Sequence, residues 1–225
     1  MADTALQRLR GRADVVSAAD VAVTERGSRY IDFLLPGLLG LNLMGSSMWG
    51  IGFAVVDARS RKLMKRFAAT PLPRAYYLLS FILARFVLLV VELAVLVAFG
   101  ALAFDVVVQG SLAALVGVSV LGALAFAGVA LLVAARPRTV EVASGWMNFV
   151  MMPMWLLSGA FFSYERFPEP LVPIIRALPL TALIDALRAI TNEGATLLAV
   201  GPQVLTLVVW MVLGFVISLR IFRWQ

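Results

Sequence analysis

Long stretches with little or no charge are the feature that most limits how this chain can fold. A helix needs about 20 predominantly apolar residues to cross the apolar core of a bilayer. Because lipid offers backbone groups no hydrogen-bond partners, such segments must be helical. Segments of this kind occupy residues 33–56, 78–104, 106–135, 142–164 and 194–219. The sequence therefore predicts an all-α, polytopic membrane protein with five transmembrane helices.

Composition and missing residue types narrow the function. The chain is 62% hydrophobic and 14% charged, whereas soluble domains are about 45–50% apolar and about 25% charged. It has no histidine and no cysteine, which excludes Ser-His-Asp triads, thiol nucleophiles and most zinc sites. The GxxxxGK[ST] loop that binds nucleotide phosphates is also missing. We therefore expect no catalysis, no metal and no cofactor on this chain, and its clustered charges do not suggest a nucleic-acid partner.

Basic residues gather at alternate connections, which predicts the orientation. Lysine and arginine concentrate on the cytoplasmic side of membrane proteins. With five spans, one side would hold Arg59, Arg61, Lys62, Lys65, Arg66, Arg74, Arg136, Arg138, Arg220 and Arg223. We expect a multi-pass protein of the plasma or inner membrane with a cytoplasmic C-terminus. The N-terminus would lie outside, with residues 1–29 as a polar external tail.

The most basic connection, residues 59–74, reads RSRKLMKRFAATPLPR. Such a segment can simply fix the topology, because its charges interact with anionic lipid headgroups. It can also form a short amphipathic helix, ended near Pro71 and Pro73, that docks into a cytoplasmic partner. Charge alone favours the first interpretation.

Residues 165–193 are too charged to form a further simple span, although apolar residues lie between the charges. Several prolines interrupt this segment. Its second half, residues 180–190, has the helical spacing of apolar residues, and Pro179 suits the first turn of a helix. The pattern predicts short helices that lie at, or dip into, the outer membrane surface.

Two charged residues, Arg85 and Glu92, fall inside the predicted span 78–104. A carboxylate inside the membrane costs about 2.5–3.5 kcal/mol or more and indicates a functional site by default. The two residues lie two turns apart on one helix face, roughly 10 Å in rise. Since direct pairing needs a bent arginine, we expect Glu92 to be partly neutralised through water or headgroups. A structural contact to a neighbouring helix is the equally open alternative.

A few polar or polarizable residues in other spans are candidates for a substrate pathway. Methionine adapts to varied apolar ligands but also fills ordinary cores, and a buried amide needs hydrogen-bond partners. In the first span, Gly37, Gly40 and Gly45 accompany the polar residues, as is typical of close helix packing. Packing is therefore the safer interpretation of most of these positions. The pathway candidates are Asn42, Glu92, Asn148 (expected as a buried amide), Met151 and Met152.

The C-terminal half carries a family resemblance. The stretch MNFVMMPMWLLSGAFFSYERFPEPLVPIIRALPLTALIDALRAI, residues 147–190, resembles the C-terminal region of type-2 ABC transporter permeases. In that family a span ending in Ser-Gly-aromatic precedes an outward, proline-bounded helical hairpin. Upstream, YIDFLLPGL at 30–38 resembles the start of the family's second span, and the basic segment ending in ATPL resembles its cytoplasmic coupling element. The resemblance covers residues 30–225.

The resemblance implies a permease domain at 30–225 that belongs to a six-span half, so the chain would lack the first span. It implies two such halves, as a homodimer or a mixed pair, working with separate ATP-binding subunits that hold ATP and magnesium. The implied coupling helix contains Arg59, Arg61, Lys62, Lys65, Arg66, Phe67 and Thr70. The implied external hairpin contains Phe161, Phe162, Pro168, Pro179, Asp185 and Arg188.

Together these features predict the membrane subunit of an ABC exporter that moves an amphipathic or hydrophobic substrate, such as a drug, an antibiotic or a lipid-like molecule. Two alternatives stay open. The chain could be an autonomous carrier or channel that uses Glu92 as a proton or cation site. It could also be a truncated, non-transporting assembly partner.

Overall fold

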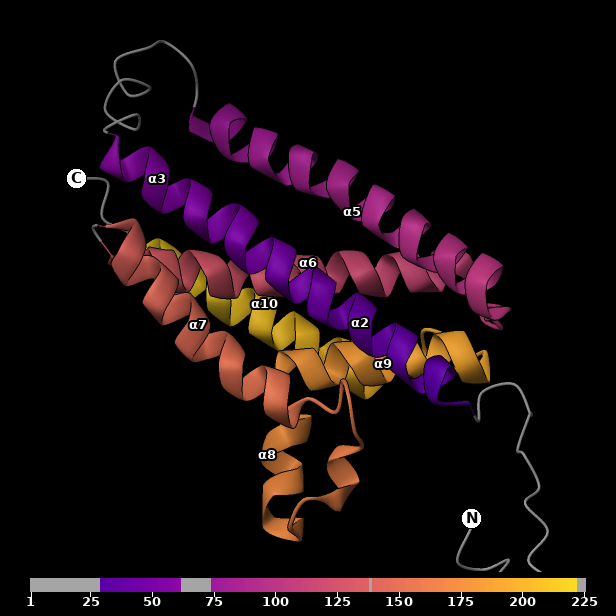
Figure 1. The fold of residues 1–225 in the computed structure, drawn as a ribbon. Helices are drawn as coiled ribbons and strands as arrows, with labels where there is room; N and C mark the ends of the chain where they lie inside the picture. The colour runs from indigo at the N-terminus through magenta and orange to yellow at the C-terminus, as the bar shows by residue number, and fades with distance from the viewer. Residues whose placement is uncertain (1–28, 62–73, 138, 222–225) are drawn as a thin grey trace, which may run out of the picture.

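The computed structural model describes residues 29–61, 74–137 and 139–221, and every regular element within these ranges is helical (Figure 1). The elements are α2 (Tyr30–Ser47), the π-helix η1 (Met48–Phe53), α3 (Ala54–Ser60), α5 (Arg74–Phe104), α6 (Leu112–Ala134), α7 (Val140–Leu157), the short 3₁₀ helices η2 (Tyr164–Arg166) and η3 (Glu169–Leu171), α8 (Val172–Arg176), α9 (Pro179–Glu193) and α10 (Gly201–Ile221). The predicted all-α architecture is confirmed.

Four helical segments are long and apolar enough to cross a membrane: Tyr30–Ser60, Leu83–Phe104, Leu112–Ala134 and Gly201–Ile221. The first combines α2, η1 and α3 into one rod. A pair of shorter helices, Glu169–Arg176 and Pro179–Glu193, bends by 83° and is a fifth candidate, as a broken span or a re-entrant loop. The helices therefore fit a polytopic membrane protein of four to five spans. The predicted fourth span, residues 142–164, overlaps α7 (Val140–Leu157), which is not one of these candidates although its 18 residues extend for about 27 Å.

Helix ends fall inside three of the predicted spans. The helices α6, α7 and α10 are shorter than the predicted segments 106–135, 142–164 and 194–219. Backbone with positive φ interrupts the chain beside them, at Asp105 (54°), Gly159 (75°) and Gly194 (66°). Glycine adopts such angles without steric cost, and aspartate tolerates them better than most residues. Apolar composition alone does not reveal the interruptions at Asp105 and Gly159, because most of the residues around these two are apolar.

The helix α9 lies in the centre of the bundle, packed against α2, α6 and α10. Leu180, Leu183, Ile184 and Leu187 are completely buried. The second helix of the hairpin is therefore buried within the bundle, which fits the expectation that it dips inward. A left-handed Gly194 ends α9 and turns the chain towards α10.

Glycines allow two of the closest helix contacts around α9. A Cβ on Gly40 would lie 2.6 Å from Cγ1 of Ile184, and one on Gly37 would lie 2.6 Å from the Ala160 carbonyl oxygen. The packing interpretation of these two first-span glycines therefore fits the structure. By contrast, a Cβ on Gly45 would meet no atom within 4 Å.

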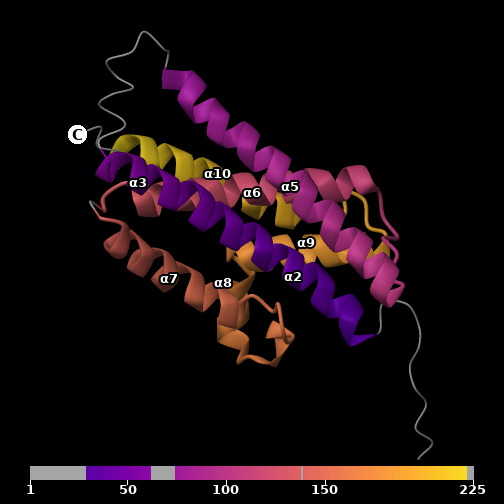
Figure 2. The same cartoon turned by 45° about the horizontal axis from the view of Figure 1, so that its top comes forward.

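The bundle has two distinct ends (Figures 1 and 2). We call the end where α3 and α6 finish and α5 and α7 begin the basic end. The opposite end, where α2 begins and α5 finishes and which holds residues 158–200, is the hairpin end. In both views α5 runs along one side of the bundle, away from α7 and α8.

Candidate functional site

At the basic end, Arg59 is held within the bundle. Its Nη1 donates to the carbonyl oxygens of Ala134 (3.0 Å), Ala135 (3.2 Å) and Pro137 (3.1 Å). Cations are favourable beside the free carbonyls at a helix C-terminus. Arg59 therefore fixes the end of α3 to the end of α6 and to the connection that leads to α7.

Of the remaining predicted coupling residues, the structure describes Arg61. Arg61 is exposed at the end of α3, and its Nε lies 2.9 Å from Oδ1 of Asp57. The others, Lys62, Lys65, Arg66, Phe67 and Thr70, lie outside the described residues. Their role in coupling stays a prediction, but the structure establishes that α3 and α5 are the two helices that flank them.

Inside the bundle, Arg85 pairs directly with Glu92. The guanidinium Nη1 lies 3.1 Å from Oε1 and 3.2 Å from Oε2, and Nη2 lies 3.2 Å from Oε2. The expectation of neutralisation through water or headgroups was wrong, because the arginine bends along its own helix far enough to span two turns. On α2, Ser47 accepts a hydrogen bond from Arg85 Nε (3.2 Å), and Ser46 donates to Glu92 (3.3 Å).

The other pathway candidates are not gathered into one site. Asn42 and Asn148 are exposed on α2 and α7, so the prediction that Asn148 is buried within this chain was wrong. The two methionines differ in exposure, since Met151 is buried whereas Met152 is 64% exposed. A span of an α-helical bundle is apolar on every side, so its sequence does not indicate which face points inward.

At the hairpin end, Arg188 joins three parts of the chain. Its Nη2 donates to the carbonyl oxygen of Gly159 (2.7 Å), and its Nε donates to that of Phe33 (3.2 Å). The guanidinium carbon lies 3.6 Å from the centre of the Phe33 ring, close enough for a cation–π interaction. One side chain of α9 thereby holds the first turn of α2 and the segment that follows α7. Sequence reasoning selected Arg188 but not this bridging role.

A second link crosses the hairpin. The hydroxyl of Tyr164 in η2 donates to Oδ2 of Asp185 in α9 at 2.8 Å, and the guanidinium of Arg176 lies 5.9 Å from the Tyr164 ring centre. Burial raises the pKa of the Tyr164 hydroxyl above its ordinary value, and the neighbouring Asp185 carboxylate adds to this shift. Sequence reasoning missed Tyr164, because a tyrosine among charged loop residues carries no distinctive pattern.

The other predicted hairpin residues shape its surface and its turns. Phe161 and Phe162 are each 44% exposed, and the Phe161 carbonyl accepts a hydrogen bond from the Tyr30 hydroxyl at 3.2 Å. Pro168 precedes η3, and Pro179 opens α9, where a missing N–H costs least.

Removing the Tyr164 hydroxyl should weaken the hairpin measurably. Tyr164→Phe deletes the hydrogen bond to Asp185, which costs about 1 kcal/mol and should lower the melting temperature by about 2–4 °C. A phenol with a raised folded-state pKa stabilises the fold below about pH 10, and that contribution is lost as the pH rises further. Thermal unfolding in detergent from pH 7 to 11 should therefore show a smaller alkaline loss in the variant. Tyr30→Phe, which removes an exposed hydrogen bond, is the control, and equal shifts in the two variants would contradict the assignment.

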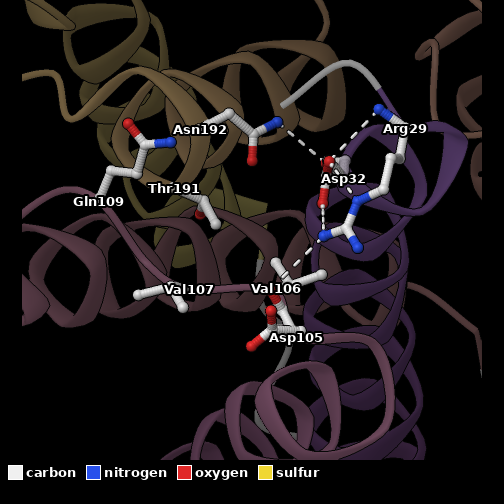
Figure 3. Close-up of a pocket in the computed structure, with 8 residues that line it drawn as sticks. All are labelled: Arg29, Asp32, Asp105, Val106, Val107, Gln109, Thr191 and Asn192. Atoms are coloured by element: carbon white, nitrogen blue, oxygen red, sulfur yellow. Dashed lines mark hydrogen bonds and ion pairs between the residues drawn. The ribbon is translucent and has the colours of Figure 1, made fainter. Parts of the chain in front are cut away.

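A small pocket lies where α2, the α5–α6 connection and the end of α9 meet (Figure 3). Arg29 donates to Asp32 (3.1 Å) and to the Phe104 carbonyl (3.0 Å), while the Asn192 amide donates to the Asp32 carbonyl (2.9 Å). The pocket has room for about one water molecule. We therefore interpret it as a junction of the hairpin end, too small for a substrate. Within the described ranges, no three acidic side chains gather closely enough to hold a metal ion.

Comparison with known proteins identifies the family. The sequence model described as "ABC-2 family transporter protein" matches residues 7–220. The Bacillus subtilis (strain 168) protein named "Putative transport permease YvfS" is 30% identical over 139 residues, 61% of this chain and 56% of that protein. "Nodulation protein J" of Rhizobium meliloti (strain 1021) is 34% identical over 100 residues, 44% of this chain and 38% of that protein.

The matches thus span little more than half of the first relative and less than half of the second. The family model, in contrast, extends through every described helix except the last residue of α10. The predicted resemblance to type-2 ABC permeases is confirmed. This chain is a multi-pass membrane protein and belongs to the ABC-2 family of transporter proteins.

Proposed function

We propose that this chain is the transmembrane permease subunit of an ATP-driven ABC exporter and that a separate subunit binds and hydrolyses ATP. The observation that carries the proposal is the family match over residues 7–220. The name of the Bacillus subtilis relative, which contains the words transport permease, agrees with it. ATP and magnesium would be held by the partner, and this chain would contribute the membrane pathway.

The basic end is the side on which the ATP-binding subunit would dock. The positive-inside rule places its lysines and arginines in the cytoplasm, with the N-terminus outside the plasma or inner membrane and the C-terminus inside. The bonds from Arg59 to Ala134, Ala135 and Pro137 support this choice. These bonds hold the end of α3 against the end of α6 and against the connection that leads to α7. A force that the partner applies to residues 59–70 would therefore be transmitted to α6 and α7.

The substrate we propose is amphipathic or hydrophobic, as a drug, an antibiotic or a lipid-like molecule is. The outward face of α7 supports this class, because Trp146, Phe149 and Met152 are between 55% and 70% exposed there. The exposed amide of Asn148 lies among them on the same helix, so the face combines apolar surface with a hydrogen-bonding group. A second permease half, identical or different, would complete the pathway.

The carrier hypothesis has less support than the permease hypothesis. A proton or cation site at Glu92 would need a carboxylate that is free to accept a cation. Both oxygens of Glu92 already contact the Arg85 guanidinium, at 3.1–3.2 Å. No structural observation favours the assembly-partner hypothesis over the permease.

Reversing the charge of the basic segment should detach the ATP-binding subunit. We expect K62E/K65E/R66E to reduce the ATPase that co-purifies with the chain from its native membrane by more than about tenfold. The reason is that like charges facing each other across an interface cost several kcal/mol, and about 1.4 kcal/mol corresponds to tenfold. The measurement is affinity purification in mild detergent, followed by mass spectrometry and an ATP hydrolysis assay.

The matched control is R136E/R220E, which reverses two exposed charges at the same end of the bundle outside the proposed coupling segment. Since charge reversal can invert a membrane protein, each variant also carries Glu165→Cys at the hairpin end. The chain has no cysteine of its own, so labelling by an impermeant thiol reagent from outside reports the orientation. Equal recovery of the ATPase with both variants, or no ATPase with any, would refute the proposal.

A further inference from the structure

The helix α5 is attached to the bundle by a narrow stripe. In its apolar window only 17% of the residues are buried, against 56% in the window of the α2–η1–α3 rod. Its buried leucines are Leu89 and Leu93, and closer to the hairpin end Gly100 lies against Leu35. Between Leu83, where description of the α5 side chains begins, and Leu89, the buried side chain is Arg85. Its bond to Ser47 attaches α5 to α2 at the start of the part of α5 whose side chains the structure describes.

The Arg85 side chain points in an unusual direction. Helical side chains lean towards the helix N-terminus. Arg85 instead extends towards the C-terminus of α5 to reach Glu92, two turns further along the helix. This tendency opposes the observed conformation, and the three contacts with Glu92 and the bond to Ser47 hold it in place.

The contacts of Arg85 and Glu92 with α2 lie beside an irregular turn that follows α2. Ser46 and Ser47 are the last two residues of α2, and the π-helix Met48–Phe53 follows at once. Such turns are rare and occur frequently at functional sites. Beyond this turn lies α3, which leads into the basic segment, and α5 emerges from the other side of that segment. Through the bonds of Arg85 to Ser47 and of Ser46 to Glu92, this ion pair of α5 is thus joined to α2 just before the irregular turn.

We propose that Arg85 and Glu92, bonded to Ser47 and Ser46, form a latch that ties α5 to α2 beside the π-helical turn. When the latch opens, the bonds to the two serines are lost, and α3 and the first half of α5 separate at the basic end. The hairpin-end halves of α2 and α5 stay joined through the contact of Gly100 with Leu35 and the Arg29 bond to the Phe104 carbonyl. Arg85 and Glu92 are positioning residues in this scheme. Only the coupling of the latch to ATP hydrolysis rests on the proposed function; the latch itself does not.

The test measures two distances in the full chain, reconstituted in lipid nanodiscs without any ATPase. Spin labels on S60C/L83C report the separation of α3 and α5 at the basic end, and labels on L38C/L102C report the hairpin-end half. All four positions are exposed, and the chain has no native cysteine. Each pair is measured by pulsed electron paramagnetic resonance in the native background, in E92Q, in the charge-swapped R85E/E92R and in E141Q. Glu141 is an exposed acid in the first turn of α7 and provides the matched control.

We expect E92Q to broaden and lengthen the S60C/L83C distances while leaving the L38C/L102C distances unchanged. The charge swap should restore the native S60C/L83C distribution, because it rebuilds the ion pair, and E141Q should match the native background. An unchanged S60C/L83C distribution in E92Q would overturn the latch. So would equal broadening of both pairs, or a swap that stays as broad as E92Q, because each indicates general loosening of the bundle. None of these results depends on an ATP-binding partner, so failure of the latch is distinguishable from failure of the proposed function.

Discussion

Arg188→Ala should be the most damaging single substitution of a charged residue in the described part of the chain. The change removes the donors to the Gly159 and Phe33 carbonyls, at 2.7 and 3.2 Å, and the cation above the Phe33 ring. Hydrogen bonds from a charged group contribute about 1.5–3 kcal/mol each. We expect a loss of about 3–5 kcal/mol. Thermal unfolding in detergent should show a fall in melting temperature on the order of 10 °C.

Two further variants make the Arg188 prediction specific. Arg188→Lys keeps the charge but not the planar fork that serves two carbonyls at once, so it should fall between the native chain and Arg188→Ala. Arg176→Ala removes an exposed arginine of the same hairpin, whose guanidinium lies 5.9 Å from the Tyr164 ring centre. It should cost less than about 1 kcal/mol. If Arg176→Ala were as harmful as Arg188→Ala, net charge at the hairpin end would matter and the bridging contacts of Arg188 would not.

The sequence predicted the elements of this fold better than their arrangement. Long apolar segments imply helices whatever their neighbours, because lipid leaves the backbone no alternative. The burial of α9 within the helix bundle could not be predicted in the same way. Its charged residues Asp185 and Arg188 suggest a surface helix, but both side chains have partners inside the hairpin end, Tyr164 for the first and the carbonyls of Gly159 and Phe33 for the second. Composition does not reveal such partners.

At the candidate sites, too, the positions of residues along the helices could be predicted, whereas their contacts and exposure could not. The spacing of Arg85 and Glu92 correctly places them on one helix face, yet the contact depends on how far a flexible arginine bends. The serines of α2 that complete the cluster carry no sequence signal, because small residues are common in any membrane helix. The exposed position of Asn148 was unpredictable for a similar reason: apolar residues surround it on the side facing the bundle and on the side facing away.

Gly214→Ala should loosen the close backbone contact between α6 and α10. A Cβ on Gly214 would lie 2.6 Å from the carbonyl carbon of Gly128, 2.9 Å from its Cα and 3.0 Å from its oxygen. Every one of these atoms is backbone, so no side chain can move aside and the two helices must separate. Overpacking of this kind costs about 1–3 kcal/mol, despite the gain in helix propensity from replacing glycine by alanine. Unfolding in detergent, followed by circular dichroism, should show the loss as a fall in melting temperature of about 2–12 °C.

The control for Gly214→Ala is Gly117→Ala on α6, the other helix of the same contact. A Cβ on Gly117 would meet no atom within 4 Å, so this variant gains helix propensity without a clash and should be neutral or stabilised by up to about 1 kcal/mol.

Gly128→Ala approaches the contact from the opposite side, where a Cβ would lie 3.2 Å from the Met211 carbonyl oxygen and 3.3 Å from the Gly214 Cα. We expect it to be less harmful than Gly214→Ala, because these distances are longer. A combined Gly128→Ala and Gly214→Ala variant should lose less than the sum of the two single losses, since helices already separated by one methyl group have room for the other. Additive losses, or destabilisation by Gly117→Ala, would mean that the two glycines act through their own helices and not through the α6–α10 contact.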